Sequence, residues 1–417
     1  MLKLAHYSIG VGDRFGHQAR AQIRAVQALK NQGVTVVPVW NKSFREHSLI
    51  GTHPADTRRA ADAAVAEEKW TSGYFLDADH ISLKNVESFL PTSDFFTLDV
   101  ADFIGKPVET ADSEAFADRH AGLTGRLSVP GIAHPLEIDR ATLIKVASRY
   151  LAAIRAAGNL YRHIAAAKKT APFVTEVSMD ETAAPQTPVE LLIILAGLAE
   201  ENIPLQTLAP KFTGEFHKGI DYIGDPAAFA REFDEDIGVI RYAVGRFNLP
   251  GNLKLSVHSG SDKFSLYPHI AASLRRHGAG VHLKTAGTTW LEEVIGLAAA
   301  GGEGLALAKR IYRLAQPQYD ALCVPYATVI SINRANLPSA DTVDAWSSGQ
   351  FVGALEHNPA CPAFNSDFRQ FIHISFRLAA ELGAVYTDAL KAHAAIIGEH
   401  VTGNLLERHL KPLFLDR

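Results

Sequence analysis

The feature that most constrains the fold is an alternation of short apolar stretches with longer helical patterns. Eight stretches have the length and the apolar content of buried strands, and they lie at residues 2–9, 34–40, 74–76, 95–98, 172–176, 204–208, 253–257 and 280–283. Strands that alternate with helices indicate a parallel sheet. A doubly wound sheet is one solution, but eight strand–helix units favour a closed (β/α)₈ TIM barrel of the α/β class.

Helix signals between these stretches support the alternation. Asp139 precedes a long helical pattern that reaches Ala167, with a break expected at Gly158. Thr187 followed by Pro188 is a strong helix start. From Thr288 onward the sequence is almost wholly helical. We therefore predict a barrel domain over residues 1–300 and a C-terminal helical extension over residues 301–417, packed on the barrel or on a partner subunit.

Composition excludes several classes of protein. The 417 residues carry a net charge of −4, which indicates neither a nucleic acid nor an anionic membrane as partner. The most apolar helical stretch, residues 191–198, is too short to span a bilayer. Cys323 and Cys361 are the 2 cysteines, too few for a disulfide framework, and the N-terminus reads as a strand. We expect a cytoplasmic protein with a small-molecule ligand, and a homo-oligomer is an open expectation.

The stretch from Tyr74 to His80 is the first segment with candidate functional residues. An apolar run there ends in two carboxylates and an imidazole, Asp77, Asp79 and His80. Charged groups cannot enter a core unpaired, so we expect the strand to stop near Leu76 and to present this polar tail at a cleft. The alternative is a turn in which one aspartate caps the next helix.

Other polar side chains also follow predicted strands. They are Glu176; Lys211, Glu215 and His217; His258, Ser261, Asp262 and Lys263; and Lys284. A barrel brings the carboxyl ends of all its strands into one ring, where barrel enzymes have their active sites. The sequence therefore predicts a single active site built from several loops.

Three histidines from three loops would form an open site for a divalent cation such as Zn, Mn, Ni or Co. We expect His80, His217 and His258 to be the ligands. Glu215, Asp262 and His282 are competing ligands, although His282 lies inside a predicted strand and would then face the core. Each chosen histidine alone could equally be a solvated loop residue.

The remaining groups suit acid–base chemistry and substrate binding. Asp79 and Glu176 are the carboxylates left free to accept and donate protons. A substrate carboxylate or phosphate would be bound by cations and their polar neighbours, namely Lys211, Ser261, Asp262, Lys263 and Lys284. Each lysine could instead pair with a neighbouring carboxylate, and Lys211 or Lys284 could form a Schiff base.

Several of these motifs resemble the tagaturonate epimerase family, some members of which act as tagatose 4-epimerases. The resemblance rests on the segments 76–80 (LDADH), 175–176 (TE), 208–219 (LAPKFTGEFHKG) and 257–263 (VHSGSDK), and it extends from about Tyr74 to the C-terminus. It implies a metal-dependent barrel enzyme that interconverts D-tagaturonate and D-fructuronate. It also implies that Asp79 accepts and Glu176 donates the proton, while His80, His217 and His258 bind the metal.

The carbon that such an enzyme inverts is one position beyond the carbon next to the ketone, so simple enolisation does not reach it. A retro-aldol cleavage does, because a base removes the hydroxyl proton and the carbon–carbon bond breaks and re-forms on the other face. Proton abstraction at the centre and transient oxidation are rival routes, but the sequence shows no nicotinamide fingerprint. A metal aldolase, another sugar isomerase and a non-catalytic sugar-binding regulator are the alternative functions.

Overall fold

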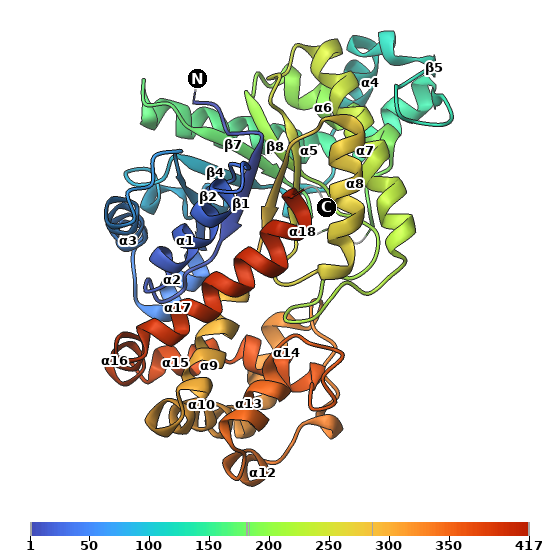
Figure 1. Ribbon diagram of the computed structural model, residues 1–417. Coiled ribbons are helices and arrows are strands. Elements are labelled where there is room, and N and C mark those ends of the chain that lie inside the picture. Colours follow the sequence, from blue (N-terminus) through green and yellow to red (C-terminus); the bar gives the residue numbers. More distant parts are fainter. Residues whose placement is uncertain (1, 181, 183, 286, 416–417) are drawn as a thin grey trace.

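A closed parallel barrel forms the centre of the molecule (Figure 1). The computed structural model describes residues 2–180, 182, 184–285 and 287–415. Within them, eight strands close in the order β1-β10-β9-β8-β7-β4-β3-β2. Their bounds are β1 (Tyr7–Val11), β2 (Val37–Ser43), β3 (Phe75–Ile81), β4 (Phe95–Asp99), β7 (Val174–Ser178), β8 (Leu205–Ala209), β9 (Lys254–His258) and β10 (Val281–Lys284). Each overlaps a predicted strand, so the predicted barrel is confirmed.

Helices cover the outside of most of the barrel. They are α1 (Ala19–Lys30), α3 (Pro54–Glu67), α5 (Arg140–Lys168), α6 (Pro188–Glu200), α7 (Pro226–Phe247) and α8 (Tyr267–His277), with the short α2 (Phe44–Ile50) after β2. Asp139 caps α5, and Thr187 forms a capping box at the start of α6. The break expected at Gly158 is wrong, because α5 continues through it. Gly158 instead leaves room for the carboxylate of Glu201, so it serves close packing.

Two connections depart from a regular strand–helix repeat. Between β3 and β4 the described chain has only a 3₁₀ turn, Val86–Ser88, and no α-helix. After β4 comes an excursion that contains α4 (Thr110–Arg119) and an antiparallel hairpin of β5 (Gly125–Leu127) and β6 (Leu136–Ile138). The eight regular units expected from the sequence are therefore an overestimate, although the strand number is right.

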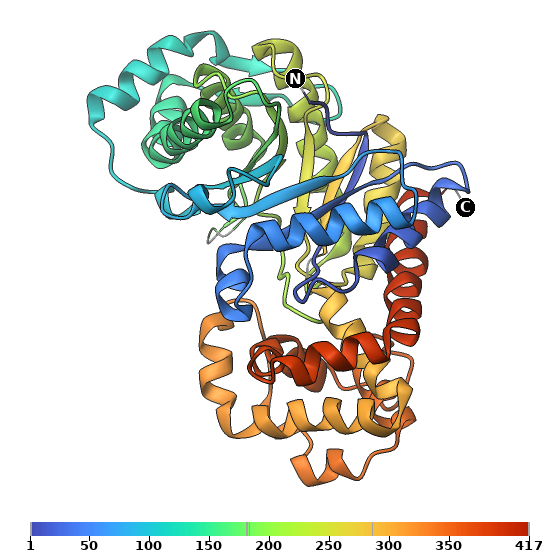
Figure 2. The same cartoon turned by 90° about the vertical axis from the view of Figure 1, so that its left-hand side faces the viewer.

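The chain after β10 forms a separate group of helices below the barrel in Figures 1 and 2. The bounds are α9 (Thr288–Ala300), α10 (Gly302–Ala315), α11 (Tyr319–Cys323), α12 (Ala340–Asp344), α13 (Ser348–Leu355), α14 (Ser366–Ile374), α15 (Phe376–Glu381), α16 (Ala384–Ala392) and α17 (Ala394–Gly403). We call residues 288–403 the helical region. It builds a second apolar core, which also includes Phe15 and Ala21 and to which α9 contributes six residues between Trp290 and Ala298. The change from the barrel's apolar core to this second core thus comes before residue 300, the predicted domain boundary.

The end of the chain returns to the barrel. A π-helix (Asn404–Leu410) and α18 (Lys411–Phe414) contribute Leu405, Leu410, Leu413 and Phe414 to the barrel's apolar core. The Phe414 ring lies 4.7 Å from the ring of Tyr7 at the start of β1. This segment packs between α1 and α8, where a regular barrel would place the helix that follows its last strand. The end of the chain thus packs on the barrel through this segment, and the division into two domains remains a prediction.

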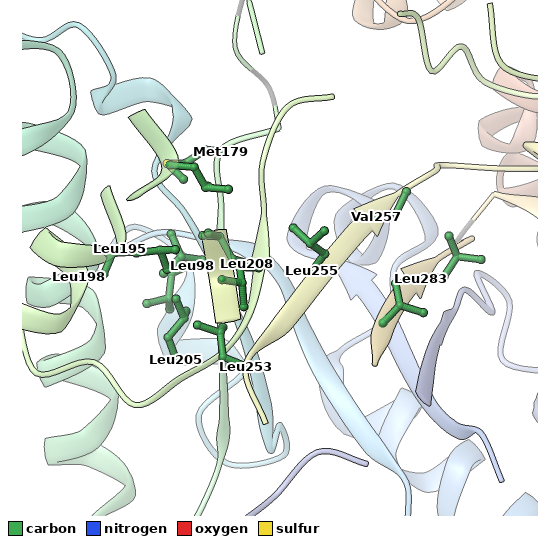
Figure 3. Packing of buried hydrophobic residues seen from close by; sticks show 14 of the residues in the cluster. Leu98, Met179, Leu195, Leu198, Leu205, Leu208, Leu253, Leu255, Val257 and Leu283 are labelled. Atoms are coloured by element: carbon green, nitrogen blue, oxygen red, sulfur yellow. The ribbon is translucent and has the colours of Figure 1, made fainter. Parts of the chain in front are cut away.

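Apolar side chains fill the layer between the barrel and its helices. Figure 3 shows Leu195 and Leu198 of α6 directed toward Leu98, Leu205 and Leu208 of the sheet. Inside the barrel, a small apolar cluster occupies the amino ends of the strands, with Val37, Phe75, Phe95 and Val174 among its members. The interior toward the carboxyl ends is polar and holds Asp77, Asp79, Glu176 and Lys284.

Two expectations about the whole chain can be compared with this structure. In the described ranges, no helix combines the length and the apolar character needed to cross a membrane. Cys323 and Cys361 are both free thiols.

Candidate active site

Lys284 occupies the middle of the polar barrel interior. Its Nζ lies 2.7 Å from Asp77 Oδ2, 3.0 Å from Asp79 Oδ1 and 2.9 Å from Glu176 Oε1. It also donates to the hydroxyl of Thr97 at 2.6 Å. A Cβ on Gly10 of the adjacent strand would collide with the Lys284 side chain, so glycine is required for this lysine to reach the centre. The alternative in which Lys284 pairs with neighbouring carboxylates is therefore the observed one.

Lys284 controls the charge of these carboxyl groups. Burial alone would lower the pKa of Lys284, but Asp77, Asp79 and Glu176 outweigh it and hold that pKa well above the ordinary value. Burial raises the pKa of Asp77 to about 7, although Lys284 opposes this shift. For Asp79 and Glu176, burial is outweighed by Lys284 and a nearby histidine, so both pKa values stay well below the ordinary range. Asp79 and Glu176 are thus ionised bases.

His258 at the end of β9 extends this network toward the barrel mouth. Its Nε2 lies 2.8 Å from Glu176 Oε1, and its Nδ1 lies 3.1 Å from Asp180 Oδ2. Asp180 follows β7 by two residues. Burial lowers the pKa of His258, but Asp180 and Glu176 outweigh it, so the net shift is upward. The second oxygen of Glu176 is buried without a hydrogen-bond partner among the described residues.

His80 closes the network into a ring, through an irregularity that the sequence does not reveal. β3 does not stop near Leu76 as expected but runs to Ile81, so Asp77 and Asp79 lie within the strand and face inward. Simple alternation would turn His80 outward. The register shifts between Ala78 and Ile81, and His80 has a φ of 52°. This bulge keeps its Nδ1 at 2.9 Å from Asp79 Oδ1 and its Nε2 at 3.6 Å from Asp180 Oδ1.

His80, Asp180 and His258 form a candidate metal site. One ligand atom from each lies within 4.8 Å of the others, and they are the one such group found among the described residues. The two imidazole rings are 5.0 Å apart at their centroids. Two imidazoles and a carboxylate are donors that Zn, Mn, Ni and Co accept. Asp180 was missed by the sequence reasoning, and its position just after a strand end is the signal that could have found it.

His217 does not join this group. Its Nδ1 lies 3.1 Å from the hydroxyl of Ser331 in the helical region, and its Nε2 lies 3.7 Å from Glu215. Glu215 is largely exposed. The ligand role expected for His217 therefore remains a prediction that the observed contacts do not display. Lys211 is half-buried, and its backbone N–H donates to Gln186; its substrate-binding role also remains a prediction.

The three consecutive residues predicted to bind substrate, Ser261, Asp262 and Lys263, are held in structural contacts. Asp262 is fully buried against Arg369 Nη2 at 2.7 Å and also accepts hydrogen bonds from other buried groups. Lys263 Nζ donates to the carbonyls of residues 217, 220 and 262 and to the Ser261 hydroxyl. These side chains fasten loops to each other, because their polar atoms are already occupied. The three residues follow the end of β9 as expected, and their substrate-binding roles remain predictions that these contacts do not display.

His282 faces the barrel interior, as the alternative expectation had it. Its Nδ1 lies 2.9 Å from the Ser8 hydroxyl, and burial lowers its pKa to about 3. Thus His282 is neutral and lies below the ring of acids and imidazoles.

A closed parallel barrel whose mouth holds carboxylates, imidazoles and a buried lysine has the architecture and the active-site position of a (β/α)₈-barrel enzyme. The chain belongs to the tagaturonate epimerase family (UxaE), whose family model matches residues 1–388. It is 30% identical over 397 residues to the tagaturonate/fructuronate epimerase of Thermotoga maritima, a match that covers 92% of this chain and 74% of that protein.

Solved structures agree with this membership. The fructuronate-tagaturonate epimerase UxaE of Cohnella laeviribosi, in complex with two glycerols, superimposes with a TM-score of 0.79 at 26% identity over 98% of this chain and 82% of that one. Its native crystal structure gives a TM-score of 0.72 over 97% and 82% of the two chains, again at 26% identity. The resemblance seen in the sequence motifs is therefore confirmed.

Proposed function

We propose that this protein is a divalent-metal-dependent epimerase that interconverts D-tagaturonate and D-fructuronate, with D-tagatose and D-fructose as a second, neutral substrate pair. The observation that carries the proposal is the ring of contacts from Asp79 through His80, Asp180, His258 and Glu176. In this ring, the carboxylates of Asp79 and Glu176 lie beside two imidazoles and a third carboxylate, which are donor types that a divalent cation accepts. Family membership supports the substrate class.

The residues present fit a divalent cation. His80, His258 and Asp180 supply two imidazoles and a carboxylate. Around them, Asp77, Asp79 and Glu176 face one ammonium group, that of Lys284. With both imidazoles neutral, as metal ligands are, a bound cation would offset this excess of negative charge. When bound, it would polarise the ketone and stabilise the negative charge that develops beside it.

Asp79 and Glu176 supply the proton transfers in this proposal. Because both are ionised, either can remove the proton from the hydroxyl on the carbon to be inverted. The carbon–carbon bond then breaks, the aldehyde fragment turns, and the bond re-forms on the other face. The protonated carboxyl group returns its proton to the new hydroxyl oxygen. Lys284 lies between the two carboxylates at 3.0 and 2.9 Å and keeps both in place.

An NMR time course tests the proposal. The protein is stripped with a chelator, then incubated with D-tagaturonate, D-fructuronate, D-tagatose or D-fructose, with and without Zn, Mn, Ni or Co. We expect each uronate to yield the other only when metal is present. Full turnover by metal-free protein would refute the metal dependence, release of three-carbon products in stoichiometric yield would favour an aldolase, and binding without isomer exchange would favour a sugar-binding regulator.

A further inference from the structure

His373 of α14 is a buried imidazole without a hydrogen-bond partner. It is 1% exposed, and neither ring nitrogen has a partner among the residues that the structure describes. A neutral imidazole always carries one N–H donor and one acceptor nitrogen. Buried polar groups in folded proteins are nearly always hydrogen-bonded, so a wholly unpartnered side chain needs an explanation.

The position of His373 supplies part of that explanation. The helical region brings the Cβ of His373 against Gly219, in the loop after β8, and its ring against Gly287, in the loop after β10. A Cβ on Gly287 would overlap the imidazole, so only glycine allows the ring to lie this close to the barrel mouth. Gly287 follows Lys284, the centre of the candidate active site, by three residues. His373 thus reaches the active-site face from outside the barrel.

Arg14 presents a second unpartnered donor to the same place. It lies in the loop between β1 and α1, 8% exposed, with its guanidinium carbon 4.2 Å from the ring centroid of Phe376. Its Nε donates to Glu46 at 2.8 Å, whereas Nη1 is buried without a partner among the described residues. Phe376 lies three residues after His373. Arg14 therefore lies against the helical region near His373, on which its charge acts.

The main charges that act on His373 are positive. Burial lowers the pKa of His373 well below its ordinary value, and Arg14, Lys218, Arg369 and Lys263 lower it further. Of these cations, Arg369 is paired with Asp262, and Lys263 donates to carbonyl oxygens. No carboxylate is among the main charges acting on His373. Donors without partners in a positive field are suited to an anion, and a planar carboxylate matches a guanidinium best.

The surroundings of Arg14 and His373 adjoin the proposed catalytic groups. Asp79 acts electrostatically on Glu46, the partner of Arg14. The main-chain N–H of Thr285, next to Lys284, donates to Gly10 at the end of β1. Arg14 and His373 are buried to a degree similar to the proposed catalytic groups, because Glu176, Lys284 and Asp79 are only 0%, 3% and 8% exposed.

We propose that Arg14 and His373 form the subsite that binds the carboxylate of the sugar-acid substrate and so set the preference for uronates over neutral ketoses. This inference rests on the proposed function. The carboxylate of a ketohexuronate lies at the opposite end from its ketone, so a site for it must lie to one side of the acid–base groups. Arg14 and His373 come from two separate elements that meet there, and the helical region thereby completes the site.

Binding and turnover together test the subsite. Calorimetry compares D-galactonate with galactitol, which differ by the carboxylate, on the wild-type protein, Arg14→Met and His373→Phe. Initial rates compare D-tagaturonate with D-tagatose. We expect the wild type to bind D-galactonate more tightly than galactitol, and each variant to lose at least about 10-fold of that preference. The loss should fall mainly on KM for the uronate, with little change for the ketose.

Arg45→Met is the matched control. Arg45 also lies against a ring of the helical region, that of Tyr326 at 5.1 Å, but it is exposed. It should behave as the wild type, and Arg14→Lys should recover part of the preference. Equal binding of D-galactonate and galactitol by the wild type, or an unchanged preference in both variants, would overturn the subsite. Wild-type protein that prefers D-galactonate but epimerises neither uronate would refute the proposed function while the subsite stands.

Discussion

The imidazole of His258 connects an acid–base group to the candidate ligand set, because its Nε2 lies 2.8 Å from Glu176 Oε1 while its Nδ1 lies 3.1 Å from Asp180 Oδ2. The side chain is 7% exposed, so both contacts are shielded from solvent. Glu176 and the candidate ligand set therefore share one imidazole.

Removing the charge of either base should slow the reaction without removing the ligand set. Asp79→Asn and Glu176→Gln keep size and hydrogen-bonding ability but cannot accept a proton as a carboxylate does. We expect each to reduce kcat on D-tagaturonate by about 100-fold or more. Steady-state kinetics on metal-loaded protein measures the loss, and calorimetry with Zn should show affinity that is little changed. Unaltered kcat in both variants would refute their catalytic roles.

Asp180 should be essential for cation binding. Asp180→Asn removes one of three donors, so the affinity for Zn should fall at least about 10-fold in calorimetric titrations. His217→Gln measured in parallel tests the ligand role that the sequence motifs imply. A comparable fall for His217→Gln would show that it moves from Ser331 to the cation. Normal affinity in Asp180→Asn would contradict the ligand group observed here.

Asp262 should stabilise the fold and take no direct part in catalysis. Its carboxylate contacts Arg369, His357, His409 and Thr288, all buried or nearly so. Asp262→Asn leaves the buried guanidinium without a counter-charge, which costs about 3–5 kcal/mol in comparable cases. Denaturant unfolding should show this loss. The exposed pair Arg377–Glu381 is the control, and Glu381→Gln should change stability by less than about 1 kcal/mol.

Glu293 should make stability depend on pH. It is buried in α9, where burial raises its pKa from 4.5 to about 8. The unfolded chain loses this proton near pH 4.5, whereas the folded protein keeps it to about pH 8. The unfolded state therefore binds fewer protons between these values, and the free energy of unfolding falls as pH rises through that window.

Glu293→Gln removes this contribution. From pH 5 to pH 8, the free energy of unfolding of the wild type should fall by at least about 1.4 kcal/mol more than that of the variant. This difference corresponds to one pKa unit. Denaturant unfolding at a series of pH values provides the measurement. Glu114→Gln, at an exposed position on α4, should follow the wild-type curve. Parallel curves for wild type and Glu293→Gln would contradict the shifted pKa.

Local sequence patterns predicted the barrel well because each strand and most helix starts are encoded over a few residues. Asp139 and Thr187 start helices as expected, and His258 and Lys284 end strands as expected. The break at Gly158 failed because close packing against another helix, which the sequence does not show, is the reason for that glycine.

Local patterns also predicted only part of the candidate site, because they do not show how side chains are oriented in space. Residue types at strand ends can be read from the sequence, so Asp79, His80, Glu176 and His258 were found. Which way each side chain points depends on register. The bulge at His80 and the short step from β7 to Asp180 brought residues together that alternation would separate. The buried contacts of Asp262 depend on helices far along the chain, which no local pattern reveals.

Anomalous X-ray diffraction at the zinc absorption edge, on crystals of catalytically active zinc-loaded protein, tests the central claim most directly. The account predicts one strong peak at bonding distance from His80, Asp180 and His258, with Asp79 and Glu176 beside it. An active protein whose only zinc peak lies elsewhere, or one that epimerises D-tagaturonate with no peak at these residues, would contradict it.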